Sequence, residues 1–115
     1  MYRAPLREMR FVLEELLRAG TLSECQHFAE YSDELGRSVL EEAAHFAEDV
    51  LEPLNRPGDT EGARWTPGGV VAAPGFRAAY EQFVAGGWPA LGAEPEYGGQ
   101  AVPRVLVSAV GEFWG

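Results

Sequence analysis

One stretch of the chain, from Asp33 to Glu52, constrains the fold more than any other. Its apolar residues recur three or four positions apart with acidic residues between them, and they are Leu35, Val39, Ala43, Phe46, Ala47, Val50 and Leu54. Because an α-helix turns once per about 3.6 residues, this spacing gives one apolar face and one acidic face. Ser32 or Asp33 is placed to cap the start of this helix. Pro53 disfavours helical geometry in the residue before it, which predicts an end at Glu52.

Three further segments have the pattern of helices. Residues 6–19 follow Pro5 and form an amphipathic segment that Gly20 is expected to end. Residues 74–85 start with a proline in the first turn, where its missing N–H costs nothing, and stop at a pair of glycines. Residues 104–114 follow Pro103 and carry apolar residues at helical spacing. Residues 21–31 are polar and mixed, with a short helix expected around residues 25–30.

Two stretches are rich in the residues that break regular structure. The first runs from Pro53 to Gly75 and the second covers residues 88–103, and we expect long loops in both, with one tight turn at Gly68-Gly69. The pair Val70-Val71 is too short and too close to glycine to predict a strand. The sequence therefore predicts an all-α fold of three to four amphipathic helices joined by two long loops rich in glycine and proline. Loops of this length more often serve contact or function than simple connection.

The balance of charges excludes one class of partner. The chain has 115 residues and a net charge of −9, and its nine basic residues are all arginine. Non-specific binding to nucleic acid needs many cationic groups, so we expect no nucleic-acid partner. The sequence lacks an apolar run of signal-peptide type at its start and any run of the ~20 apolar residues of a membrane span. These features, with a single cysteine, predict a cytoplasmic protein.

Several segments together resemble the N-terminal helical domain of the acyl-CoA dehydrogenase family. The similarity is strongest to the long subgroup with an N-terminal extension, of the methylthioacyl-CoA dehydrogenase type. The resemblance covers almost the whole chain and keeps the order of the segments. The segments that carry it are YRAPLREMRFVLEEL, LEEAAHFAEDVLEPLNRPGDTEGAR and PGFRAAYEQFVAGGWPALGAEPEYGGQAVP. The last of them is the most specific, because of its arrangement of glycines and aromatic residues.

The resemblance implies a flavoenzyme of fatty acid metabolism. Family members are oxidoreductases that use FAD to remove hydrogens from the α and β carbons of an acyl-CoA thioester. A carboxylate base takes the α proton, and the flavin accepts hydride and passes electrons to an electron-transfer acceptor. The family fold has a helical N-terminal, a β middle and a helical C-terminal domain, usually in a homo-oligomer. The catalytic glutamate and most flavin contacts lie in the last two domains, so the resemblance implies no catalytic residue in this chain and no bound FAD.

The same resemblance divides the chain and points to one loop. Residues 1–31 correspond to the extension with one helix, and residues 32–115 to the helical domain without the middle and C-terminal domains. The chain would be a truncated polypeptide, a proteolytic remnant or a natural short protein. Its predicted role is to pack against the missing domains and to close one side of the acyl pocket. The candidate residues for the substrate pocket or an interdomain loop are Trp88, Tyr97, Gly98 and Gly99. A tight turn between helices is an equally good interpretation of the two glycines.

Two patterns of glutamate and histidine raise the question of a metal site. Glu24 with His27, and Glu42 with His45, have the spacing that di-iron proteins of the ferritin type place inside a four-helix bundle. The second pair falls on the polar face of the predicted central helix, and the first lies in a segment without an apolar stripe. We therefore predict solvent-exposed pairs and no metal. Cys25 lacks the surroundings that activate a thiol, so a structural or inert cysteine is predicted.

A second function from another class fits the same composition. A small acidic helical module could bind a partner protein through its apolar faces without any catalytic activity. The dehydrogenase hypothesis predicts that the isolated chain self-associates, because a short helical chain built to contact two missing domains has apolar faces to cover.

Overall fold

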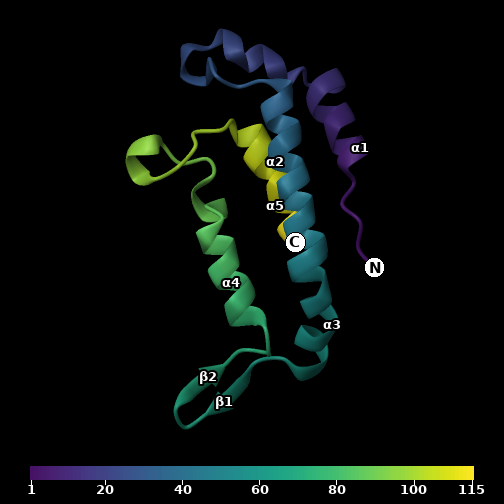
Figure 1. The fold of residues 1–115 in the computed structure, drawn as a ribbon, viewed down its shortest axis with the longest axis vertical. Helices are drawn as coiled ribbons and strands as arrows, with labels where there is room; N and C mark the ends of the chain where they lie inside the picture. The colour runs from purple at the N-terminus through teal and green to yellow at the C-terminus, as the bar shows by residue number, and fades with distance from the viewer.

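The computed structural model describes all residues, Met1–Gly115, and the fold is all-α apart from one small hairpin. The molecule is a flat slab with extents of 55 × 34 × 16 Å (Figure 1). Its α-helices are α1 (Leu6–Arg10), α2 (Asp33–Phe46), α3 (Glu52–Glu61), α4 (Phe76–Ala85) and α5 (Arg104–Trp114). Two segments are π-helical, Phe11–Leu16 and Ala47–Leu51. Four are 3₁₀-helical, Ala19–Glu24, Gln26–Phe28, Trp88–Ala90 and Pro95–Tyr97. The strands are β1 (Arg64–Thr66) and β2 (Gly69–Val71).

The predicted central helix is confirmed at its start and extends beyond its predicted end. The Ser32 hydroxyl caps α2 by accepting a hydrogen bond of 3.1 Å from the Leu35 backbone N–H. The predicted end at Glu52 is wrong, because the helical path continues through the π-helical turn into α3 and reaches Glu61. In that turn the Glu52 N–H bonds to the Ala47 carbonyl, five residues back. Pro53 directly follows this turn, where the regular hydrogen-bond ladder of the helix is already interrupted, and its missing N–H is tolerated there.

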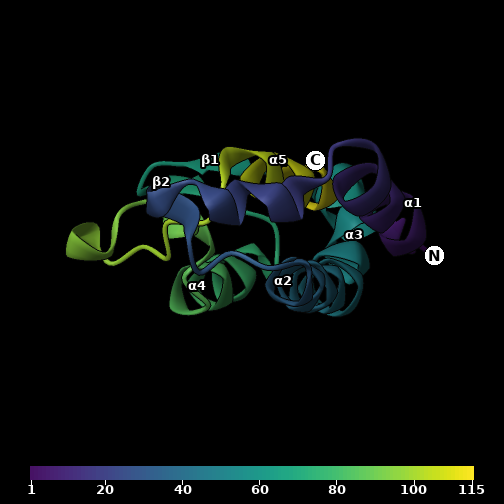
Figure 2. The same cartoon turned by 90° about the horizontal axis from the view of Figure 1, so that it is seen from above.

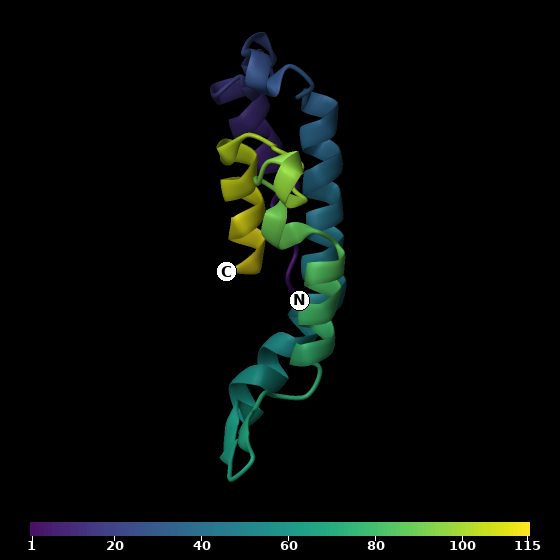
Figure 3. The ribbon, with the colours of Figure 1, turned by 90° about the vertical axis from the view of Figure 1, so that its left-hand side faces the viewer.

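The helices form two layers. Views from above and from the side place α2 and α4 in one layer and α1 and α5 in the other (Figures 2 and 3). Helix α2 contacts both α1 and α5, and α5 also contacts the π-helical turn. Helix α3 and the hairpin extend away from this body at one end of the long axis (Figure 3). The layers therefore meet mainly along α2.

The core lies where α2 faces α1 and α5. Helix α2 and the turn after it contribute mostly small residues, which are Gly36, Leu40, Ala43, Ala44 and Ala47. Small side chains let helix axes approach closely, and α5 fills the space between them with Leu106, Val110 and Phe113. Leu91 and Val102 from the long loop before α5 join the same cluster. The core therefore forms where the first and last helices, α1 and α5, pack against α2.

The N-terminal segment joins this core and differs from its prediction in one detail. Met9 and Leu13 are buried in the main cluster. The predicted end at Gly20 is wrong, since the helical path stops at Leu17 and Arg18 takes the left-handed conformation with φ 50°. The short helix expected around residues 25–30 is present as the 3₁₀ turn Gln26–Phe28.

A β-hairpin replaces part of the loop predicted between Pro53 and Gly75, so the absence of strands in that prediction is wrong. Strands β1 and β2 pair in antiparallel register, with Trp65 opposite Val70. The turn lies at Pro67-Gly68, one residue before the predicted position, and the Thr66 hydroxyl donates a hydrogen bond of 2.7 Å to the Gly69 carbonyl. A strand of three residues is too short to show the alternation of apolar and polar residues that marks a strand, and the sequence therefore does not reveal this hairpin.

The last two predicted helices are close to their expected ranges. Helix α5 begins after Pro103 as predicted. Helix α4 ends at Gly86 as predicted, but it starts at Phe76 rather than at Pro74. Gly75 precedes it with φ 87°, a left-handed conformation that glycine adopts without strain. Pro74 lies in the turn before that glycine, outside the helix.

Candidate functional site

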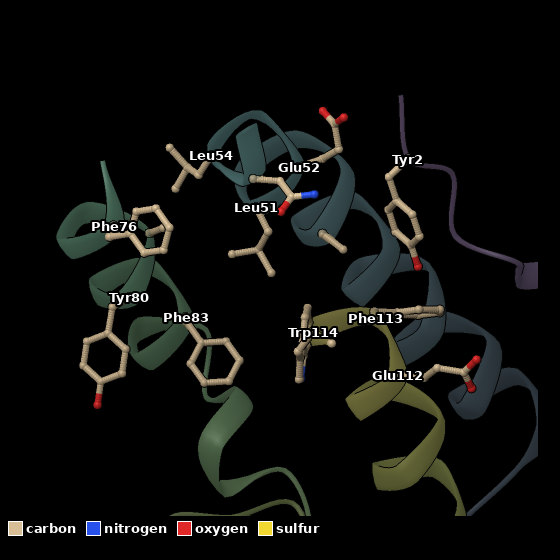
Figure 4. A pocket seen from close by; sticks show the side chains of 14 residues that line it. Tyr2, Leu51, Glu52, Leu54, Phe76, Tyr80, Phe83, Glu112, Phe113 and Trp114 are labelled. Atoms are coloured by element: carbon tan, nitrogen blue, oxygen red, sulfur yellow. The ribbon is translucent and has the colours of Figure 1, made fainter. Parts of the chain in front are cut away.

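An open apolar cleft lies where α4, α3 with its preceding π-helical turn, and the end of α5 converge (Figure 4). Its volume is about 500 Å³. Most of the residues that line it are apolar, and the full lining is Tyr2, Ala47, Leu51, Glu52, Leu54, Asn55, Phe76, Ala79, Tyr80, Phe83, Glu112, Phe113, Trp114 and Gly115. A concave apolar surface with few polar groups is the usual form of a site for a small molecule or for part of another chain.

The continuation of α2 into α3 positions one wall of the cleft. The π-helical turn and α3 carry Leu51 and Leu54 toward α4, whose Phe76 and Phe83 face them across the space (Figure 4). Gly58 permits the close approach of α3 and α4, because a Cβ there would lie 2.5 Å from the Phe76 ring. A helix that ended at Glu52 would leave the cleft without this wall.

Four aromatic rings hold the inner end of the cleft together. The Trp114 ring lies edge-on to Phe83, with centroids 5.4 Å apart, and edge-on to Phe46 at 5.7 Å. Trp88 also contacts Trp114, with ring centroids 5.4 Å apart. Edge-to-face pairs at these distances add to the energy of burying the rings. Trp114 is therefore the side chain that joins α4, α2 and α5 at the cleft.

The charged groups of the cleft are both acidic. Glu52 and Glu112 stand at its rim, and the arginines of the chain are absent from the lining. Tyr2 lies beside Phe113 and near Glu112 (Figure 4). Burial raises the pKa of the Tyr2 hydroxyl above its ordinary value, and the negative charges of Glu112 and Glu48 raise it further. At neutral pH the hydroxyl is therefore protonated and offers a hydrogen-bond donor.

The lining does not fit FAD. The diphosphate of a flavin dinucleotide needs cationic side chains or free backbone N–H groups, and here it would meet Glu52 and Glu112 instead. The lining also contains no histidine, cysteine or lysine that could act as a base or nucleophile near neutral pH. The cleft is suited to binding an apolar group.

The structure separates the residues that the sequence proposed as a site. Trp88 is half-buried in the 3₁₀ turn Trp88–Ala90 and reaches the cleft only through its contact with Trp114. Tyr97 is 76% exposed at the end of the turn Pro95–Tyr97 and is not part of the lining. Most of the apolar residues that form the cleft belong to three helices that the sequence predicted, at residues 33–52, 74–85 and 104–114. Their convergence was not visible, because it depends on the continuation through Pro53.

Local geometry requires both glycines of the Tyr97-Gly98-Gly99 loop. Gly98 has φ 81°, a left-handed conformation in which a side chain is strained. A Cβ at Gly99 would lie 1.9 Å from the Ala93 carbonyl oxygen, so no side chain fits there. The Gly99 N–H also bonds to the Glu94 carbonyl at 3.1 Å and closes the turn. The tight-turn interpretation accounts for both glycines, and the exposure of Tyr97 leaves an interdomain role as a prediction.

The structure does not bring the two glutamate–histidine pairs together into one site. The Nε2 atom of His27 lies 3.1 Å from a carboxylate oxygen of Glu94, so the side chain of His27 contacts Glu94 rather than Glu24. Glu42 and His45 are exposed and line a second, more polar hollow of about 780 Å³ between α2 and the end of α4. The structure contains no group of three or more histidine, cysteine, aspartate or glutamate side chains placed to hold a metal ion. Cys25 is exposed and makes no disulfide.

Comparison with known proteins shows a clear similarity to a characterised enzyme. The chain is 38% identical over 112 residues, which is 97% of its length, to a 3-methylmercaptopropionyl-CoA dehydrogenase from Ruegeria pomeroyi. The chain resembles an acyl-CoA dehydrogenase. It spans 19% of the length of that relative, so the comparison covers a minor part of the related enzyme. No family model matches the chain.

The match confirms the resemblance inferred from the sequence motifs. The match extends over nearly the whole chain. The name of the matched enzyme describes a sulfur-containing acyl-CoA, in agreement with the methylthioacyl-CoA dehydrogenase subgroup that the sequence motifs indicated. The helical fold agrees with an acyl-CoA dehydrogenase helical domain. None of the helices is long and apolar enough to cross a membrane.

Proposed function

We propose that this chain is the N-terminal helical domain of a FAD-dependent acyl-CoA dehydrogenase. Such an oxidoreductase converts the bond between the α and β carbons of an acyl-CoA thioester into a double bond. The single observation that carries the proposal is the 38% identity over 97% of the chain to the dehydrogenase from Ruegeria pomeroyi. In this proposal residues 1–31 are the extension, residues 32–115 are the domain, and the catalytic base and the flavin belong to other parts of the enzyme.

The domain would contribute one side of the acyl pocket. The apolar lining around Leu54 and Phe83 supports this role, because an apolar surface suits an aliphatic chain. Glu52 and Glu112 at the rim would repel the phosphate groups of the coenzyme A moiety, so the acyl end would enter and the nucleotide end would stay outside. The domain would position the substrate and take no part in proton or hydride transfer.

The remaining parts of the proposal concern contacts. Trp88 and the exposed loop at Tyr97, Gly98 and Gly99 would face another domain or the substrate pocket. The parent enzyme would be a cytoplasmic homo-oligomer that passes its electrons to an electron-transfer acceptor. The isolated chain would bind no flavin tightly and would self-associate through the apolar surface that the other domains cover.

A chimeric enzyme tests the proposal directly. The segment of the Ruegeria pomeroyi dehydrogenase that matches this chain is replaced by residues 1–115, and FAD content and oxidation of 3-methylmercaptopropionyl-CoA are measured. We expect a flavin-loaded, active chimera, because the two segments are 38% identical over 112 residues. A soluble chimera that lacks both flavin and activity would contradict the proposal. The control is the unmodified dehydrogenase from the same preparation.

Two simpler measurements support the chimera experiment. The intact mass of the native polypeptide in its source cells should be several times 12.5 kDa, the mass of this chain. Size-exclusion chromatography of the isolated chain with added FAD should show self-association and no co-eluting flavin. A monomer that carries one flavin per chain would contradict the assignment of flavin binding to other domains.

A further inference from the structure

The N-terminal helix has an unusual distribution of side chains. Four apolar residues on successive turns of this helix are exposed to solvent: Phe11 (53%), Val12 (42%), Leu16 (63%) and Leu17 (55%). Two polar residues of the same segment face the protein instead, because Arg10 pairs with Glu41, and Glu14 accepts hydrogen bonds of 2.6 and 2.7 Å from Arg37. Glu8 and Glu15 are exposed. We call the four exposed residues the outer face of the N-terminal helix.

The π-helical turn Phe11–Leu16 creates this arrangement. In a π-helix the hydrogen bond spans five residues, and here the Leu17 N–H bonds to the Val12 carbonyl at 2.9 Å. Residues five apart are therefore neighbours, which brings Phe11 beside Leu16 and Val12 beside Leu17. Regular α-helical spacing would distribute these residues differently around the helix. The turn thus gathers the outer face into one continuous apolar patch.

The surroundings of the outer face favour a protein surface as its partner. The chain has a net charge of −9 and no lysine, so the anionic surface of a membrane would repel it. A patch of apolar side chains in this number presents on the order of 400 Å². A stable complex of separate proteins buries ~800 Å² on each partner. The outer face alone is therefore too small to hold an independent partner or a second copy of this chain.

A small apolar face is sufficient when its partner is covalently attached. Two parts of one polypeptide meet at an effective concentration in the millimolar range, so a modest contact stays closed. If the chain is part of a dehydrogenase, as proposed above, the other four-fifths of such an enzyme supplies that partner. We infer that Phe11, Val12, Leu16 and Leu17 form the surface on which another domain of the same polypeptide docks. This inference rests on the proposed function.

The test places charge on the outer face of the chimera described above. The double variant L16E/L17E is compared with L16M/L17M, which keeps the face apolar, and with Q26E, which adds a carboxylate at an exposed site nearby in the sequence. The readout is the rate of tryptic cleavage after Arg18, which directly follows the face and is exposed. We expect cleavage roughly tenfold faster in L16E/L17E, because the open form becomes more populated. The two controls should match the parent chimera.

The outcomes separate the inference from the proposed function. An inactive parent chimera without flavin contradicts the proposed function. An active chimera in which L16E/L17E is cleaved at the parent rate contradicts only the docking surface. Circular dichroism of the isolated L16E/L17E chain should equal that of the unmodified chain, since both leucines are exposed. Loss of helix in that chain would show that the two leucines support the fold itself, and would also overturn the inference. A dimer of the isolated chain that L16E/L17E abolishes, with unchanged cleavage in the chimera, would assign the face to a second copy.

Discussion

The two ends of this molecule use apolar side chains in opposite ways. In the body formed by α1, α2 and α5, side chains such as Leu40, Leu106 and Val110 are fully covered by other parts of the same chain. In the arm formed by α3, the hairpin and α4, α3 has no buried residue and Trp65 is 77% exposed. Composition explains part of the difference, since α3 is mostly polar, but the large apolar residues Phe76 and Tyr80 of α4 are also exposed, at 42 and 66%.

The difference shows which apolar surfaces the chain covers by itself and which it leaves exposed. In the body, α2 packs against α1 and α5, whereas α3 and the hairpin of the arm extend beyond these helices (Figures 1 and 3). The cleft opens at the junction, where the arm meets the end of α5. Exposed apolar surface of this extent marks a contact that another part of a protein normally covers. The following variants of the isolated chain, ordered from the largest expected effect to the smallest, test this contrast.

The variant Leu106→Ala should have the largest effect, because it removes a fully buried side chain from the centre of the body. We expect a loss of about 2–5 kcal/mol in the free energy of unfolding, from lost burial and the cavity that remains. Urea denaturation followed by circular dichroism measures it. A loss below that range would mean that the body is not a packed core.

The variant Gly99→Ala tests the loop that brings Leu91 and Val102 into the body. The new methyl group would overlap the Ala93 carbonyl oxygen, so the turn must distort, at a cost of roughly 1–3 kcal/mol. Gly98→Ala is the matched control. It adds a methyl group to open space and carries only the left-handed backbone penalty, roughly 1 kcal/mol. Equal losses in the two urea midpoints would contradict the close approach at Gly99.

The ion pair between Glu14 and Arg37 predicts a dependence of stability on pH. Hydrogen bonds from Arg37 lower the pKa of the Glu14 carboxyl below its ordinary value of 4.5. A lowered pKa in the folded state stabilises the protein above the unfolded pKa, and this contribution is lost as the pH falls through the folded value. We therefore expect the unfolding free energy to fall below about pH 4.5, and to fall less steeply in Glu14→Gln. Parallel pH profiles for the two proteins would rule out this contribution.

The variant Trp65→Ala should have the smallest effect on stability. Because its side chain is exposed on the hairpin, we expect a change within about 0.5 kcal/mol in the isolated chain. The same variant in the chimera should lower the unfolding temperature if the hairpin contacts another domain there. A loss in the isolated chain as large as that of Leu106→Ala would erase the distinction between the body and the arm.

The sequence alone determined the start of the central helix, with its cap at Ser32 or Asp33, and the last helix after Pro103, because these depend on local periodicity and capping. It also determined the family resemblance, because 38% identity persists along the whole chain. The glycines of the loop at Gly98 and Gly99 were recognisable as special positions, since only glycine combines positive φ with close backbone approach.

Only the tertiary structure decided which apolar residues are covered. Leu13 and Leu16 have similar side chains three residues apart, yet the first is buried and the second is 63% exposed. The π-helical turns cause this difference in burial, because each turn rotates every later residue to a new position around the helix axis. The spacing of apolar residues by three and four positions in the sequence does not reveal such a turn. The second such turn carries the helix through Pro53 and builds the cleft wall. Local pattern therefore fixed the helices, and the packing of one helix against another fixed the surfaces that remain open.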